Sequence, residues 1–118
     1  MTTATAQRFH VADMPALPGV PCPCGTARRA FADVPGGVAT LHRTTISADS
    51  QTHYHRKMTE LYCVLEGEGT MEVDGERVPL KPGLALYIAP GCRHRAVGNL
   101  TVMIVAIPQF DPADEYFD

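Results

Sequence analysis

Residues 47–67 read SADSQTHYHRKMTELYCVLEG, and this stretch decides how the rest of the chain is interpreted. Side chains of an extended strand alternate between its two faces, so His53 and His55 point the same way. Their Cα atoms are then roughly 6.5 Å apart, and both imidazoles can reach one metal ion at about 2.0–2.2 Å. Residues 56–59 form a connection that can bring Glu60 back beside them. The pattern indicates a metal site.

A fourth candidate ligand, His94, lies just after the turn predicted at Pro90-Gly91. Taken singly, each of the four residues has a more ordinary explanation. A lone histidine is usually a surface or hydrogen-bonded residue, and Glu60 can be a solvated acid at the end of a strand. The metal site is therefore favoured only because the flanking sequence supports all four together, as described below.

Outward from this stretch the chain has the texture of an all-β protein. Short runs of β-branched residues alternate with turns, and Asp74-Gly75 is a strong two-residue hairpin signal. Almost no helix is predicted, which favours an antiparallel sandwich or barrel. We expect strands at residues 38–47, 60–66, 70–73, 77–78, 84–88 and 101–107, with a break at residues 67–69.

The length of 118 residues fits a single domain. Residues 1–37 are rich in Pro and Gly and are expected to form an irregular, partly extended N-terminal arm that includes one strand. Residues 38–110 are expected to form the barrel. Residues 111–118 form a short acidic C-terminal tail, in which Asp111-Pro112 is typical of the start of a helix of a turn or two.

Composition excludes several classes of partner. The net charge is −3 and no basic patch is present, so nucleic acid is not expected as a partner. The longest apolar run, residues 100–107, is too short to span a bilayer, and no membrane partner is expected. No secretory signal is visible at the N-terminus, which favours the cytoplasm.

The same inference favours reduced thiols for the cysteines. Cys22 and Cys24 are too close in sequence for a relaxed disulfide and are read as ordinary cysteines of a Pro-rich arm, with participation in a metal site as the less favoured alternative. Cys92 is read as a small turn residue, and the alternative is a thiol near the barrel mouth that senses oxidation.

Two motifs make the metal site specific. Residues 47–67 resemble the first motif of the cupin superfamily, Gly-x5-His-x-His-x3,4-Glu-x6-Gly, with Ser47 in place of the first Gly. Residues 83–98 resemble the second motif, Gly-x5-Pro-x-Gly-x2-His-x3-Asn, with Ala89 in place of the Pro and Gly98 in place of the Asn. None of these departures removes a metal ligand. The matching positions are His53, His55, Glu60, Gly67, Gly83, Gly91 and His94.

The resemblance implies a double-stranded β-helix, which is a jelly-roll barrel, with one metal ion held by His53, His55, Glu60 and His94. It also implies that the protein forms a homodimer. A set of three imidazoles and one carboxylate suits Fe, Mn, Ni, Co, Cu or Zn. We favour Fe(II) or Mn(II) as the native divalent transition metal.

Three functions are compatible with such a barrel. The first is a metalloenzyme of the oxygenase, isomerase or lyase type that acts on a small molecule, with Tyr62, Met71 and Tyr87 shaping the substrate pocket. No general base is identified from the sequence. The second is a non-catalytic module that binds a metabolite or a sugar, and the third is a barrel in which the metal only stabilises the fold. One fold supports many chemistries, so the resemblance does not choose between them.

Overall fold

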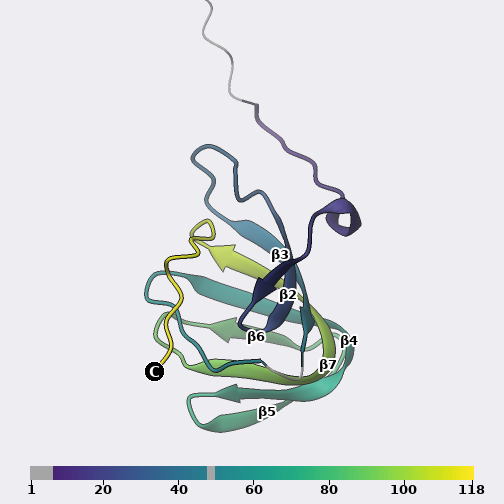
Figure 1. Cartoon of the computed structure of the whole chain (residues 1–118), viewed down its shortest axis with the longest axis vertical. Helices are drawn as coiled ribbons and strands as arrows, with labels where there is room; N and C mark the ends of the chain where they lie inside the picture. The colour runs from purple at the N-terminus through teal and green to yellow at the C-terminus, as the bar shows by residue number, and fades with distance from the viewer. Residues whose placement is uncertain (1–6, 48–49) are drawn as a thin grey trace, which may run out of the picture.

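The structure is a computed structural model that describes residues 7–47 and 50–118, so residues 1–6 of the predicted arm lie outside it. In the described residues, one 3₁₀ helix and seven strands follow one another (Figure 1). They are η1 (Met14–Ala16), β1 (Val20–Cys22), β2 (Gly25–Ala30), β3 (Thr40–Ile46), β4 (Thr59–Val73), β5 (Glu76–Leu80), β6 (Ala85–Ile88) and β7 (His94–Ile107).

The strands form one antiparallel sheet that curves around a common interior. The hydrogen-bonded order is β1-β2-β3-β7-β4-β5, and β6 pairs with β4 beside this path. The long strands β4 and β7 pair along nearly their whole length. The half of β4 nearer its start also pairs with β6, and the other half with β5. The prediction of an all-β jelly-roll barrel is confirmed.

Strand β4 is continuous where the sequence predicted a break at residues 67–69, so that prediction was wrong. A β-bulge interrupts the register of β4 and β7 between Val64 and Glu66, and such bulges bend a strand rather than end it. Gly67 has a φ of +90°, and a Cβ there would lie 1.9 Å from the backbone oxygen of Asn99. The absence of a side chain at Gly67 therefore allows β4 and β7 to approach closely at the bend.

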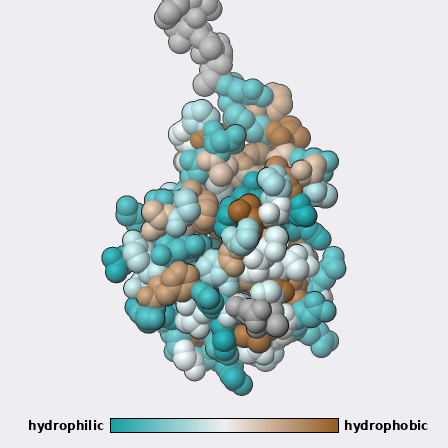
Figure 2. Space-filling view, in the orientation of Figure 1, coloured by the Kyte–Doolittle hydropathy of each residue, from teal (hydrophilic) through white to brown (hydrophobic). Residues whose placement is uncertain are grey.

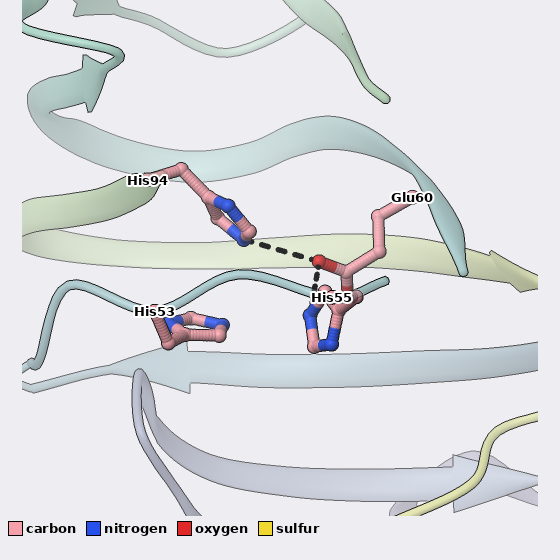
Figure 3. A group of neighbouring side chains, drawn as sticks. All are labelled: His53, His55, Glu60 and His94. Carbon is pink, nitrogen blue, oxygen red and sulfur yellow. Dashed lines mark hydrogen bonds and ion pairs between the residues drawn. The ribbon is translucent and has the colours of Figure 1, made fainter. Parts of the chain in front are cut away.

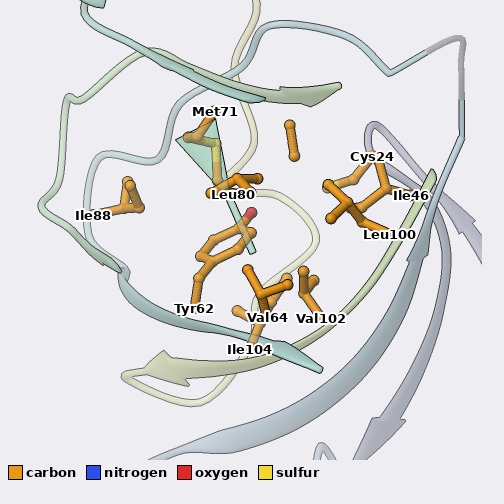
Figure 4. Packing of buried hydrophobic residues seen from close by; sticks show 11 residues of the cluster. Cys24, Ile46, Tyr62, Val64, Met71, Leu80, Ile88, Leu100, Val102 and Ile104 are labelled. Carbon is orange, nitrogen blue, oxygen red and sulfur yellow. The ribbon is translucent and has the colours of Figure 1, made fainter. Parts of the chain in front are cut away.

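The interior is filled by alternate side chains of β3, β4 and β7, as the two-residue period of a strand requires. Figure 4 shows these side chains converging between the curved strands. Glu60, Tyr62 and Val64 are all buried at alternate positions of β4. The alternation that builds the core therefore also turns the carboxylate of Glu60 inward. The labelled core residues are Cys24, Ile46, Tyr62, Val64, Met71, Leu80, Ile88, Leu100, Val102 and Ile104.

The sheet begins earlier than residue 38, where the barrel was expected to start. Strands β1 and β2 form a hairpin, and β2 pairs with β3 along its full length. Ala27 and Ala30 are buried in this pairing, and their small side chains carry little of the hydrophobic signal that marks a strand in a sequence. The segment 1–37 thus contributes two strands to the sheet, one more than predicted.

The C-terminal tail contains no helix, contrary to the prediction. The Asp111 side chain accepts a hydrogen bond from the backbone N–H of Ala113 at 2.9 Å, which closes a turn. The chain then runs extended, and Tyr116 forms a β-bridge with Tyr54. Pairing with the barrel therefore takes the place of helix formation, and the tail lies along one end of the barrel (Figure 1).

The described part of the surface carries few large groups of apolar side chains, because most of these side chains point inward. On the face seen in Figure 2, apolar residues are scattered among hydrophilic ones, which is normal for a folded domain. None of the helices in the described part of the chain has the length and apolar character needed to cross a bilayer.

Candidate metal centre

The four side chains predicted to bind metal meet at one end of the barrel. Each offers a ligand atom, and these atoms all lie within 4.8 Å of one another. Figure 3 shows the imidazoles and the carboxylate pointing toward a common centre. All four side chains are buried. They are His53, His55, Glu60 and His94.

Backbone pairing sets the positions of these side chains. His53 and His94 lie opposite each other in a β-bridge and exchange two backbone hydrogen bonds, at 3.2 and 3.0 Å. Glu60 lies near the start of β4, where it pairs with both β6 and β7. His53 and His55 are in an extended segment before β4, and their rings are 5.2 Å apart between centroids. The backbone pairing of the sheet therefore brings the four side chains together.

Each histidine is held in the same tautomer by a backbone carbonyl. The Nδ1 atom of His53 bonds to the oxygen of Gln51 at 2.9 Å, that of His55 to the oxygen of Asp114 at 2.6 Å, and that of His94 to the oxygen of Cys92 at 2.9 Å. A carbonyl oxygen only accepts hydrogen bonds, so each Nδ1 must be the donor. Each Nε2 is then left with its lone pair available for a metal.

The Nε2 atoms face a carboxylate oxygen. Oε1 of Glu60 lies 3.0 Å from Nε2 of His55 and 3.1 Å from Nε2 of His94. Nε2 of His55 is buried without a well-directed hydrogen bond, although it is within ion-pair distance of Glu60. Two acceptors at this separation repel unless a proton or a cation lies between them. The donor set therefore fits a divalent cation.

The charges of the cluster favour an ionised Glu60 beside a neutral His53, while, against the effect of burial, the hydrogen bond to Glu60 and its charge raise the pKa of His55. Burial opposes ionisation of Glu60, but hydrogen bonds and charge from His55 and His94 outweigh it and hold the pKa of Glu60 well below its ordinary value. Burial, together with the charge of His94, lowers the pKa of His53 to about 4. A carboxylate and a neutral imidazole are the forms that bind metals.

A family model described as Cupin domain matches residues 35–107 of the chain, a segment that includes both motifs. The chain belongs to the cupin family. A crystal structure of a protein from Planctomyces limnophilus superposes on this cupin with a TM-score of 0.90 at 40% identity, covering 96% of this chain and 100% of that one.

Two enzymes resemble parts of this cupin. L-ectoine synthase of Mycolicibacterium gilvum is 34% identical over 76 residues, which span 62% of this chain and 57% of the synthase. The Streptomyces nucleoside dehydratase Pac13 shares the fold, with a TM-score of 0.67 at 22% identity over 77% of this chain and 73% of that one. The cupin spans about half the length of the curated relatives that it matches.

Asp114 in the tail supports the site and was not singled out from the sequence. Its buried carboxylate accepts hydrogen bonds from the backbone N–H groups of Arg56, Lys57 and Met58, at 2.9, 3.1 and 3.0 Å. Its own carbonyl oxygen accepts the Nδ1 proton of His55. One tail residue therefore fixes both the connection before Glu60 and the orientation of His55.

A cavity of about 440 Å³ lies near the cluster of four, although none of the four side chains of the cluster lines it. Its lining includes Cys22, Gln51, Glu115 and Phe117. Two of its lining residues are neighbours of His53: the carbonyl oxygen of Gln51 accepts the Nδ1 proton of His53, and the ring centroid of Phe117 is 6.4 Å from that of His53. Burial raises the pKa of Glu115, while His55 and Arg29 oppose that rise. We call this cavity the mouth; its residues from the tail had no motif to reveal them.

The three predicted pocket residues have different environments. Tyr62 is buried with its ring centroid 6.0 Å from that of His94, and Met71 is fully buried in the core. Tyr87 is not brought to the cluster, because it is 70% exposed and lies opposite Leu61 on the outer face. The inward positions of β6 belong to its neighbours, and the assignment of Tyr87 to a substrate pocket stays a prediction.

Proposed function

We propose that this cupin is a metalloenzyme that acts on a small molecule with one divalent transition metal held by His53, His55, Glu60 and His94. The observation that carries the proposal is the common tautomer of the three histidines, whose Nε2 atoms converge on a buried carboxylate. The partial similarity to L-ectoine synthase supports an enzymatic role.

The donor set favours Fe(II) or Mn(II), while Ni, Zn, Co and Cu also suit it. When bound, such a metal supplies a Lewis acid that polarises an oxygen of the substrate. The chain itself contributes a dry environment, because the four donors are buried, and it fixes their directions through backbone carbonyls. These are the features that keep a metal site rigid.

Glu115 is the candidate for proton transfer that the sequence did not reveal. Its carboxyl group lines the mouth and is partly buried, and burial raises its pKa. A carboxyl group with a raised pKa is suited to exchange a proton with a substrate at neutral pH. Isomerases and lyases require such a proton transfer, so we favour them over an oxygenase.

The first test is stoichiometric metal binding. Protein purified from its native host is expected to contain one Fe or Mn per chain by elemental mass spectrometry, and stripped protein to bind one Mn(II) by calorimetry. Turnover is then followed by NMR for isomerisation and elimination, and by an oxygen electrode for oxygenation. A protein that binds no ion contradicts the proposal, whereas metal-dependent binding of a metabolite without turnover identifies the non-catalytic module.

Dimer formation and location are also part of the proposal. Leu61 and Tyr87 expose apolar surface side by side on the outer face of β4 and β6, which supports association of two copies through this face. Light scattering is expected to give twice the mass of one chain, and Tyr87→Glu to shift it toward a single chain. A single-chain mass for the unchanged protein contradicts the dimer. The cytoplasm stays the predicted location.

A further inference from the structure

The hairpin of β1 and β2 places two cysteines beside the mouth. Cys22 ends β1 and pairs with Gly25, so Pro23 and Cys24 form the turn between the strands. Cys22 is partly exposed and lines the mouth together with Glu115 and Phe117. Cys24 is 8% exposed and packs in the core. One thiol is thus open to small molecules, and its neighbour is shielded.

The two thiols differ in chemical character. A hydrogen bond from the Cys24 thiol lowers the pKa of Cys22 to about 7, and the backbone N–H groups of Cys24 and Gly25 and the charge of Arg29 act in the same direction, against the effect of burial. The hydrogen bond to Cys22 and burial raise the pKa of Cys24. Because the thiolate is the nucleophilic form, Cys22 is suited to attack and Cys24 to act as the second thiol.

The same turn is connected to the metal centre by hydrogen bonds. The carbonyl oxygen of Pro23 accepts the backbone N–H of Gln51 at 2.8 Å. The carbonyl oxygen of Gln51 in turn accepts the Nδ1 proton of His53 at 2.9 Å. The carbonyl oxygen of Cys24 accepts the N–H of Ser47 at 2.9 Å. The conformation of the turn therefore determines the position of the carbonyl that orients His53.

We propose that Cys22 and Cys24 form a peroxide-sensitive pair whose oxidation weakens the hold of His53 on the metal. The metal part rests on the proposed function. The Cys22 thiolate attacks a peroxide oxygen, so that an S–O bond forms, the O–O bond breaks and hydroxide leaves. The Cys24 thiol then attacks the sulfur of the sulfenic acid, and an S–S bond forms as water leaves. The proton that the Cys22 thiol lost when it ionised neutralises the hydroxide. Overall, two thiols lose two electrons, and one hydrogen peroxide is reduced to two waters.

Such a disulfide is strained, which makes it reversible. Residues two apart on an extended strand have Cα atoms about 6.6 Å apart, within the range in which a disulfide can form, but the bond encloses only Pro23. Strained disulfides are the easily reduced ones. The turn must change shape to accept the bond, so the carbonyl of Pro23 moves and Gln51 loses its partner. Loss of an outer contact to a metal ligand typically costs 10–100-fold in affinity.

The test compares the unchanged protein with Cys22→Ser and with the control Cys63→Ser, which removes an exposed thiol on the outer face of β4. Each reduced protein is treated with hydrogen peroxide, desalted and loaded with Mn(II), a metal that prefers oxygen and nitrogen donors to thiolates. Peptide mass spectrometry locates the oxidation, and a chelator measures the rate of Mn(II) release.

We expect loss of two hydrogens in the peptide that contains Cys22 and Cys24, and Mn(II) release about 10-fold faster, both reversed by dithiothreitol. Cys22→Ser should show neither effect, and Cys63→Ser should show both. Oxidation of Cys63 or Cys92 ahead of Cys22, or a Cys22–Cys24 disulfide that leaves the release rate unchanged, overturns the proposal. Peptide masses need no metal, so a chain that fails to bind Mn(II) refutes the metalloenzyme separately from the thiol chemistry.

Discussion

At the scale of single residues, the ligand histidines can be separated from other histidines by substitution. His53→Ala and His94→Ala each remove one of four donors, so metal occupancy should fall strongly. His10 is exposed in the N-terminal arm, and His10→Ala should leave metal content unchanged. Elemental analysis of the three purified variants gives the comparison. Equal losses in all three would mean that a folding defect had been mistaken for coordination.

Asp114 should matter for stability as well as for the metal. Asp114→Ala leaves three backbone N–H groups without their acceptor, of which that of Met58 is buried, and an unpaired buried group costs about 1–3 kcal/mol. We expect the free energy of unfolding of the metal-free protein to fall by about 3 kcal/mol, measured in urea. Mn(II) affinity should fall about 10-fold or more.

Asp111→Ala is the matched control for that substitution. Asp111 is exposed and accepts one hydrogen bond within its own turn. The control should change the free energy of unfolding by about 0.5 kcal/mol, the usual size of a surface effect. A loss as large as that of Asp114→Ala would show that the tail, and not its buried carboxylate, stabilises the protein.

At the scale of elements, the bend of β4 depends on Gly67. Gly67→Ala combines a positive φ of +90° with a backbone oxygen 1.9 Å from the new Cβ. Gly75→Ala is matched in φ, at +82°, but has open space around the new Cβ. A positive φ costs an alanine about 1–2 kcal/mol in either place. We expect the free energy of unfolding, measured in urea, to fall by at least about 2 kcal/mol more in Gly67→Ala than in Gly75→Ala. Equal losses in the two variants would mean that the strands separate easily at the bend.

The limits of sequence reasoning also lie at this scale. His53, His55 and Glu60 were predicted as a group because the alternation of a strand and one short connection bring them together. The roles of Asp114 and Glu115 depend on the tail returning to the barrel end, and no periodic pattern encodes that return. Residues 67–69 were misread as a break, because glycine serves equally well in a turn and in a tight strand crossing.

At the scale of the whole molecule, the barrel buries polar residues that the sequence left unassigned. His42 on β3 is buried, and its Nδ1 accepts a hydrogen bond from Nε of Arg29 at 3.3 Å. Because Arg29 can only donate, the imidazole is neutral and its Nε2 donates to Oγ1 of Thr40 at 2.8 Å. Burial and the charge of Arg29 lower the pKa of His42 to about 4. The folded protein therefore holds His42 buried in its neutral form.

This buried histidine predicts acid sensitivity of the metal-free protein. Between the unfolded pKa of about 6.5 and the folded value of about 4, the unfolded chain binds a proton that the folded chain does not. The contribution of His42 is therefore fully present above pH 6.5 and is lost as pH falls to 4, amounting to about 3 kcal/mol. His53 adds to the loss in the same direction.

Urea unfolding at several pH values should show this dependence of the free energy of unfolding on pH. His42→Gln should make the dependence weaker, whereas His10→Gln should not. An undiminished slope in His42→Gln would mean that the imidazole of His42 takes up its proton without unfolding.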